Sequence, residues 1–434
     1  MPTRILTVVV LLAAVAIVQA PIAMAAPFEV WVVDQSNSPG LTYGGTLRVF
    51  EGDDLMGESL SEAQPVATVD LGGATDALCV ASTGAHPARP HMLFFSSTRT
   101  HAVLAFVASG HVVIFDAAAR APLACLRMSP GAGGARQAHA AFPAPDDSFI
   151  LVANQNGKLL ERIDTDYATG TFSLNAAAGL DLAGCTTPGG AACQAAGIRP
   201  DNAPICPIVD SSSGLAFVTL RGGGLFVVNP TTTPMAIVAE YDRAMVHGNG
   251  CGGVEAGGSM FITSGGGTAS NLHEFDVYRF PLAGYDPAHP PNTPAPEPIF
   301  SDDAAERDAH GMTVTGRGRY LWVTDRGANL IEVFDVATGE RLETLPLEGS
   351  DSADPTPDLA DVSPSGNRVF VAMRGPNPLS GDPHVATGVT PGLMVLQVEE
   401  GGRRGIVKGI VRVSNLDAAG VERADPHAVR VRRR

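Results

Sequence analysis

The sequence predicts an all-β fold in which seven four-stranded antiparallel units close into a ring, and three observations lead to this prediction. Residues 308–347 contain four short strands with alternating or β-branched residues, separated by glycine-containing turns. Openings similar to the start of this unit recur along the chain. The first unit lacks one strand, and residues 425–431 supply a single strand with no unit after it. Because each unit is apolar on both faces and needs neighbours, we expect a single seven-bladed β-propeller closed by its N- and C-terminal strands.

The first 25 residues predict a signal peptide. Arg4 precedes an apolar run over residues 5–18, and residues 23–25 form an A-x-A cleavage site. The run is short for a membrane span, and no later stretch approaches the length of one. We therefore expect an exported protein, periplasmic or extracellular, with a signal peptide at 1–25, a propeller at 26–434 and no membrane span after cleavage.

The strands follow in order along the mature chain. The first unit has three strands of its own, at residues 28–34, 45–51 and 65–71. The six later units are placed by their opening strands, which begin near Thr75, Gln137, Cys206, Gly250, Asp308 and Asp358. Three insertions interrupt the period, at residues 176–201, 282–298 and 374–391. Long loops on a rigid ring are common places for binding specificity.

Three motifs in the sixth unit resemble the YVTN family of β-propeller repeats. They are DAHGM, LWVTDRGAN and VFDVATGE, and weaker versions occur in units three and seven. The resemblance implies the propeller fold but little about chemistry, because one scaffold hosts many functions. Relatives on this scaffold include lactone hydrolases, heavy chains of amine dehydrogenases such as methylamine dehydrogenase, copper-dependent oxidases and binding proteins.

Net charge indicates which partners are disfavoured, and the cysteine content indicates which disulfides can form. Lysine and arginine number 29 against 45 acidic residues, and the resulting net charge of −16 argues against nucleic acid as a partner. Six cysteines in an exported chain can be oxidised, and Cys185 and Cys193 are the easiest local disulfide pair.

One position of each blade points toward the central channel. The start of every inner strand faces one end of that channel, so equivalent positions converge there. Alignment of the units on their first turn places at this position His139, Cys206, His310, Asp358 and His427. Nearby in sequence are His247, Cys251 and, for the second unit, Asp76 or Cys79. The remaining histidines, including His91, are expected to be ordinary surface or half-buried residues.

These converging side chains have two interpretations. Imidazole, thiolate and carboxylate groups together are ligands for copper, zinc or iron. Alternatively, as the family resemblance implies, the histidines and the aspartate hydrogen-bond backbone groups and join neighbouring blades, and we favour this structural role. Cys206 and Cys251 open adjacent blades, so they are metal ligands or, as we favour, a disulfide. Arg136, Arg243, Arg326 and Arg374 lie near blade openings or second-strand exits and are candidates for binding an anionic substrate.

The sequence contains no complete catalytic motif. It lacks a G-x-S-x-G elbow, a Walker loop and an H-E-x-x-H helix, so catalytic residues are unknown and no cofactor other than a transition metal is indicated. The leading hypothesis is an exported, monomeric propeller that binds a small molecule or protein partner on its loop face. The alternatives are a metal-dependent enzyme at the channel mouth, either a lactonase-like hydrolase or a copper or iron oxidoreductase, and a docking subunit for a redox partner.

Overall fold

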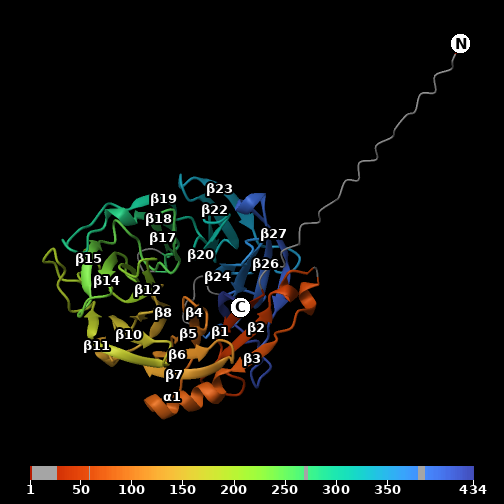
Figure 1. The fold of residues 1–434 in the computed structure, drawn as a ribbon, viewed down its shortest axis with the longest axis horizontal. Helices are drawn as coiled ribbons and strands as arrows, with labels where there is room; N and C mark the ends of the chain where they lie inside the picture. The colour runs from red at the N-terminus through yellow and green to blue at the C-terminus, as the bar shows by residue number, and fades with distance from the viewer. Residues whose placement is uncertain (2–26, 58, 268–271, 380–386) are drawn as a thin grey trace.

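The computed structural model describes residues 27–57, 59–267, 272–379 and 387–434, together with Met1. Its described part forms seven four-stranded antiparallel sheets arranged in a ring around a central channel (Figure 1). The predicted seven-bladed propeller is therefore confirmed. The predicted signal peptide lies outside the described residues, and no described helix is long and apolar enough to cross a membrane.

The blades are numbered along the chain, and the strands of each blade are named from the inner to the outer one. Blade one consists of β28 (Pro426–Arg433), β1 (Phe28–Asp34), β2 (Thr46–Glu51) and β3 (Ala67–Asp70). Blade two consists of β4 (Pro90–Phe95), β5 (His101–Phe106), β6 (His111–Asp116) and β7 (Ala121–Arg127). Blade three consists of β8 (Ala138–Pro143), β9 (Phe149–Asn154), β10 (Leu159–Asp166) and β11 (Thr171–Asp181).

The other four blades follow the same plan. Blade four consists of β12 (Pro204–Val209), β13 (Ala216–Leu220), β14 (Leu225–Asn229) and β15 (Ala236–Tyr241). Blade five consists of β16 (Gly253–Ala256), β17 (Ser259–Ser264), β18 (Phe275–Pro281) and β19 (Glu297–Asp302). Blade six consists of β20 (Ala309–Thr315), β21 (Tyr320–Asp325), β22 (Leu330–Asp335) and β23 (Arg341–Pro346). Blade seven consists of β24 (Pro357–Val362), β25 (Arg368–Met373), β26 (Gly392–Glu399) and β27 (Arg404–Arg412).

The ring closes between the two ends of the chain, as predicted. β28 is the inner strand of blade one and pairs antiparallel with β1, with Val30 opposite Val431. Side chains from blades one and seven pack together across this junction, among them Phe28, Phe370 and Val395. Closure leaves every inner strand covered by a neighbour, which removes the exposed edges of an open array.

The prediction for the start of blade two is wrong. Residues Asp76–Thr83 form the only described α-helix, α1, on the outer rim of the ring beside β7 (Figure 1). The helix stops at Gly84, which has a left-handed φ of 71°. Its short apolar stretch fits a strand as well as a helix, so its periodicity could not decide between them. Cys79 is disulfide-bonded to Cys125 of β7, which fastens the helix to the blade.

A bulge at the start of the inner strand recurs around the ring. The pairing of inner and second strands skips residues between Pro90 and Leu93, Ala138 and Ala140, Pro204 and Pro207, Ala309 and Met312, and Pro357 and Ala360. The pairing of β28 with β1 skips His427 in the same way. A bulge re-aims a side chain away from the regular pleat. The skipped residues include His91, His139, Cys206, His310 and Asp358, so the bulges direct these side chains toward the channel.

Buried threonines hold the inner-strand starts of blades four, five and six, of which blade five pairs with its second strand in a regular register. In blade six, Thr324 Oγ1 receives a hydrogen bond from the Gly311 N–H (2.7 Å) and donates to the carbonyl oxygen of Asp358 in blade seven (2.8 Å). Thr219 and Thr263 make the equivalent contacts at the junctions of blades four with five and five with six. Gly311 must lack a side chain, because a Cβ there would overlap the Asp358 carbonyl oxygen. His310-Gly311 and Val323-Thr324, which belong to the motifs of the sixth unit, are therefore parts of one blade junction.

We predict that Thr324→Val destabilises the protein. The change keeps the shape of the side chain but leaves the buried Gly311 N–H without its acceptor, so the free energy of unfolding should fall by about 1–3 kcal/mol. Guanidinium-induced unfolding followed by fluorescence would measure the loss.

Thr68→Val is the matched control, because Thr68 is exposed on the outer strand β3. If both variants unfold at the same denaturant concentration, the junction hydrogen bonds do not contribute to stability as we infer.

Candidate functional site at the channel mouth

The inner-strand starts enclose a cavity of about 580 Å³ at one end of the channel. Its side chains are mainly basic or amide groups, and no aspartate or glutamate occurs among the described residues that line it. The basic residues of the lining are Arg89, His91, Arg136, His139, Arg221, His310, Arg326, Arg374 and His427. In a chain of net charge −16, this is a local concentration of positive charge and imidazole.

His91 supplies the channel position of blade two, in place of the predicted Asp76 or Cys79. It lies in the bulge of β4, is 7% exposed, and its ring stacks on His427 with centroids 3.6 Å apart. Sequence reasoning missed it because the inner strand was placed too early in the chain. The Pro90-His91 pair carried the signal, since Pro426 precedes His427 in the same way.

His91 and His139 face each other in the cavity. Their Nε2 atoms are 3.3 Å apart. His139 Nδ1 lies 3.0 Å from the carbonyl oxygen of Ile205 in blade four, and a carbonyl can only accept, so this nitrogen carries the hydrogen. His139 Nε2 is therefore the acceptor of the 3.3 Å contact, and His91 Nε2 carries the hydrogen between the two rings. His91 Nδ1 lies 3.1 Å from the side-chain amide of Gln35. His139 also joins blade three to blade four, which is the structural role that the family resemblance implied.

His310, Asp358 and His427 form the second part of the site. His310 Nε2 is 2.8 Å and His427 Nε2 is 3.5 Å from Asp358 Oδ1, while Arg374 contacts the other carboxylate oxygen at 3.0 Å. Burial and Arg326 act to lower the pKa of His310, but Asp358 and Cys251 outweigh them and raise it to about 10. Burial opposes ionisation of Asp358, yet His310 and His427 bring its pKa well below 3.8.

The other two buried imidazoles are neutral near pH 7. Burial is the main reason that the pKa values of His91 and His427 lie well below 6.5, and neighbouring cationic groups add to the effect. The cavity therefore combines a protonated imidazole at His310 with neutral imidazoles at His91 and His427. Such a pairing of groups with separated pKa values is the usual basis for acid and base roles in one site.

Carboxylates behind the cavity hold its buried arginines in place. Arg374 makes two contacts with Asp425, at 2.6 and 2.9 Å, and Arg326 is paired with Asp308. Both guanidinium groups are nearly inaccessible to solvent, with exposures of 1% and 2%. The predicted anion-binding candidates Arg136, Arg326 and Arg374 line the cavity, whereas Arg243 is not among its lining residues.

Cys206 and Cys251 meet beside His139, as their positions on adjacent blades predicted. Their Sγ atoms are 3.1 Å apart, and both residues are buried free cysteines, so the favoured disulfide is not formed in this structure. Cys206 Sγ also lies 3.8 Å from Met92 Sδ. The predicted Cys185–Cys193 disulfide is present, and Cys79–Cys125 is the second one.

His247 lies apart from the groups gathered at the channel. Its Nδ1 contacts Glu274 at 2.5 Å and Asp276 at 2.7 Å, and 41% of its side chain is exposed. Hydrogen bonds to Asp276 and Glu274 raise the pKa of His247 to about 10, so it is an imidazolium between two carboxylates. The fifth blade places it before the inner strand, where it faces its own blade.

The structure separates the predicted ligand set into three groups. Donor atoms converge within 4.8 Å in His139–Cys206–Cys251, in His310–Asp358–His427 and in His247–Glu274–Asp276. In the second and third groups the carboxylates already face an imidazolium, and Arg374 adds positive charge to the second. A divalent cation fits these two groups poorly, because it would have to displace that proton beside fixed positive charge. Of the three, the cysteine group is free of this conflict.

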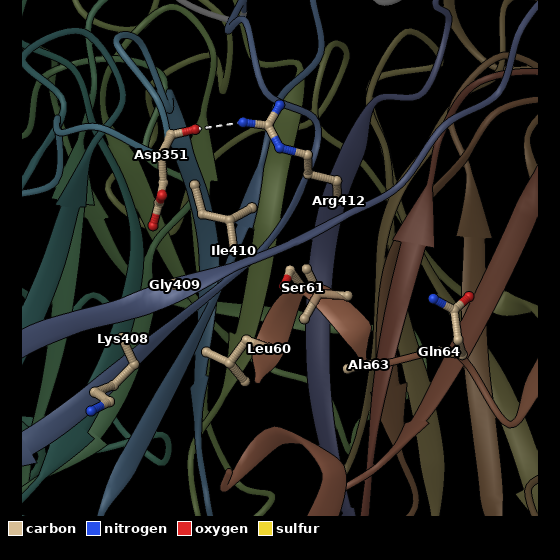
Figure 2. A pocket seen from close by; sticks show the side chains of 10 residues that line it. Leu60, Ser61, Ala63, Gln64, Asp351, Lys408, Gly409, Ile410 and Arg412 are labelled. Atoms are coloured by element: carbon tan, nitrogen blue, oxygen red, sulfur yellow. Dashed lines mark hydrogen bonds between the residues drawn. The ribbon is translucent and has the colours of Figure 1, made fainter. Parts of the chain in front are cut away.

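A smaller pocket on the outer rim does not resemble a functional site. It has a volume of about 280 Å³ and lies between η2 (Leu60–Glu62) and β27 (Figure 2). Arg412 closes one side by donating a hydrogen bond to the Asp351 carbonyl oxygen at 2.7 Å. Its described lining contains no histidine or cysteine, in contrast to the channel mouth.

Several solved structures similar to this chain have lactonase names. A candidate 6-phosphogluconolactonase from Bacteroides fragilis has a TM-score of 0.55 and 12% identity, over 95% of this chain and 99% of the other. One from Bacteroides uniformis has a TM-score of 0.57 and 12% identity, over 94% and 99%. The periplasmic gluconolactonase of Pseudomonas aeruginosa has a TM-score of 0.55 and 15% identity, over 94% and 99%. These likenesses establish the fold.

No protein-family model matches the chain, and no curated protein matches it in sequence. The YVTN resemblance therefore stays a prediction about family, while the propeller itself is established by the sheets.

We predict that Asp358→Asn destabilises the protein and changes its pH dependence. The variant leaves His310 and Arg374 without a buried counter-charge, and the free energy of unfolding at pH 6 should fall by about 3–5 kcal/mol. The raised pKa of His310 stabilises the native protein fully below 6.5 and is lost as pH rises toward about 10. The lowered pKa of Asp358 stabilises it above 3.8. Denaturant unfolding between pH 5 and 10 would show the alkaline loss in the wild type and a shallower one in the variant.

Asp286→Asn provides the control, because Asp286 forms an exposed pair with His289. Equal stability of Asp358→Asn and wild type at pH 6 would contradict the assigned charges.

Proposed function

We propose that this protein is an exported hydrolase that opens a small anionic lactone at the channel mouth. The observation that carries the proposal is the cavity of about 580 Å³, which combines arginines with neutral and protonated imidazoles. The lactonase names of the structural neighbours support the same class of substrate. Two disulfides and a periplasmic neighbour support export, since disulfides persist in oxidising compartments.

Arginines suit the cavity to an anionic substrate. Arg136 lines it half-buried, and its Nε donates to the Met128 carbonyl oxygen at 3.0 Å, which fixes the direction of the guanidinium. Arg221 is oriented by Asp201 at 2.6 Å. Guanidinium groups recognise carboxylate and phosphate through paired hydrogen bonds. The surrounding acidic protein would otherwise repel such a ligand, so this local field decides where it binds.

The imidazoles supply the groups that lactone hydrolysis needs. Water adds to the ring carbonyl, the ring C–O bond breaks, and the products are a carboxylate, a hydroxyl group and the released proton. His91 and His139 form a pair with one hydrogen between their Nε2 atoms, and this pair can accept the proton of the attacking water. The His310 imidazolium lies on the same cavity and can stabilise the negative charge that develops on the carbonyl oxygen.

Binding without catalysis is the second candidate. The described residues that line the cavity include no carboxylate, thiol or hydroxyl side chain that could serve as a covalent nucleophile. This composition favours a protein that only captures an anionic sugar acid. Measurement of binding and turnover on one sample separates the two functions.

We predict that His91→Gln lowers kcat for gluconolactone by about 10²–10⁴-fold and leaves KM nearly unchanged, because a general base acts only in the chemical step. In the wild type, kcat/KM should stay flat as pH falls through 6.5, since the pKa of His91 lies well below that value. A pH-indicator assay at low buffer concentration measures both parameters.

Arg136→Gln tests recognition of the anion. The variant should raise KM for 6-phosphogluconolactone by roughly tenfold or more, the value of a hydrogen bond to a charged group, with a smaller effect on the unphosphorylated lactone. Arg319→Gln is the control, because Arg319 is exposed on a blade edge.

Calorimetric titration with gluconate and 6-phosphogluconate completes the test. Binding that Arg136→Gln weakens, without turnover of either lactone, would replace hydrolysis by simple binding. Absence of both binding and turnover would rule out the anionic sugar acid and its lactone as ligands.

A further inference from the structure

The sulfur atoms of Cys206, Cys251 and Met92 form a cluster beside the cavity. We propose that the Cys206–Cys251 pair binds copper(I). Met92 and His139 complete the donor set. None of the three sulfur residues lines the cavity, and His139 is the donor that this site shares with the proposed reaction.

The donor atoms lie at separations that one ion can span. Cys206 Sγ is 3.1 Å from Cys251 Sγ and 3.8 Å from Met92 Sδ. Donor atoms of His139, Cys206 and Cys251 lie within 4.8 Å of one another. Two metal–sulfur bonds of about 2.3 Å at a tetrahedral angle place sulfur atoms ~3.8 Å apart, so the cysteines need to separate by less than about 1 Å.

Binding of copper(I) to the two cysteines balances without electron transfer. Cu⁺ replaces the two thiol hydrogens, which leave to solvent as protons, and the product is a copper bis-thiolate with a charge of minus one.

The surroundings tolerate that single negative charge. Both cysteines and Met92 belong to one apolar cluster, with exposures between 0% and 4%. Arg430 is close enough that both cysteines raise the pKa of its guanidinium, although burial has the larger, lowering effect. Its side chain is oriented by the Leu93 carbonyl oxygen at 3.1 Å. A buried thiolate pair with one neighbouring cation suits a monovalent metal ion better than a divalent one.

The chemistry of the donors selects copper(I) over zinc and iron. Thiolate and thioether sulfur are soft ligands, and a thioether is a usual ligand of copper but not of structural zinc. His139 has the support common among metal-binding histidines, since its Nδ1 donates to the Ile205 carbonyl oxygen and fixes the ring. The competing fate of the cysteines is oxidation to a disulfide, which would remove both thiolate ligands.

The test uses the full mature protein, reduced and kept free of oxygen. It is titrated with copper(I) against a coloured copper(I) chelator, and zinc(II) is titrated in parallel. We expect one equivalent of copper, near-ultraviolet absorption from thiolate–copper bonds and protection of both free cysteines from alkylation. Cys206→Ser/Cys251→Ser should lose this binding, and Met92→Leu should weaken it on the order of tenfold.

Cys185→Ser/Cys193→Ser is the matched control, since it removes two cysteines that lie elsewhere and should retain the copper. If the first double variant does not fold, Met92→Leu still decides, because leucine keeps the volume of the side chain. Copper binding equal to wild type in both sulfur variants overturns the proposal. The proposal is also overturned if the protein binds zinc(II) more tightly than copper(I), or if the reduced protein binds no copper. Arg136→Gln, which should weaken lactone binding, should keep the copper, so failure of copper binding is distinguishable from failure of the proposed hydrolysis.

Discussion

The junction between neighbouring inner strands is the constraint on which the rest of the structure depends. In six of the seven blades the strand is bulged at that point, and in blades four to six a buried threonine accepts a hydrogen bond from a backbone N–H of the inner-strand start. The same hydroxyl contacts a carbonyl oxygen of the next blade, as Thr324 does with Asp358. Blade-to-blade packing and side-chain direction are thereby coupled. A regular ladder would turn these side chains onto the sheet faces, whereas the bulge gathers them around one axis.

Because several cationic side chains converge on that axis, they would repel one another without nearby negative charge. Cationic groups line the cavity, and the carboxylates that balance them lie one layer behind, as with Arg374 against Asp358 and Asp425. Removal of one carboxylate would leave a buried charge unpaired, which costs more than the pair contributes. The layering keeps the arginines ionised and rigid while it leaves the cavity surface positive. A ligand therefore encounters preorganised donors rather than arginines that must first be ordered.

Much of this arrangement could be read from the sequence, and the exceptions have physical reasons. The ring, its closure and the channel positions of His139, His310 and His427 followed from repeated turn spacing, which is a local property. Blade two failed because residues 75–83 carry too few apolar positions to distinguish a helix from a strand, and His91 was lost with it. The ionisation states of the channel histidines and of Asp358 could not be predicted from the sequence. They depend on which carboxylate lies behind which base, and that is set by contacts between blades.

The channel thus holds two kinds of chemistry side by side, and their separation follows from hardness and solvation. The imidazoles and arginines line a cavity whose cationic donors can bind an oxygen anion. The sulfur atoms of Cys206, Cys251 and Met92 lie outside that lining and are enclosed by apolar side chains. An oxygen anion would be poorly solvated among them, and a soft cation would find no thiolate in the cavity lining. His139 lines the cavity and also lies close to both thiols, so its ring connects occupation of the sulfur site to the cavity.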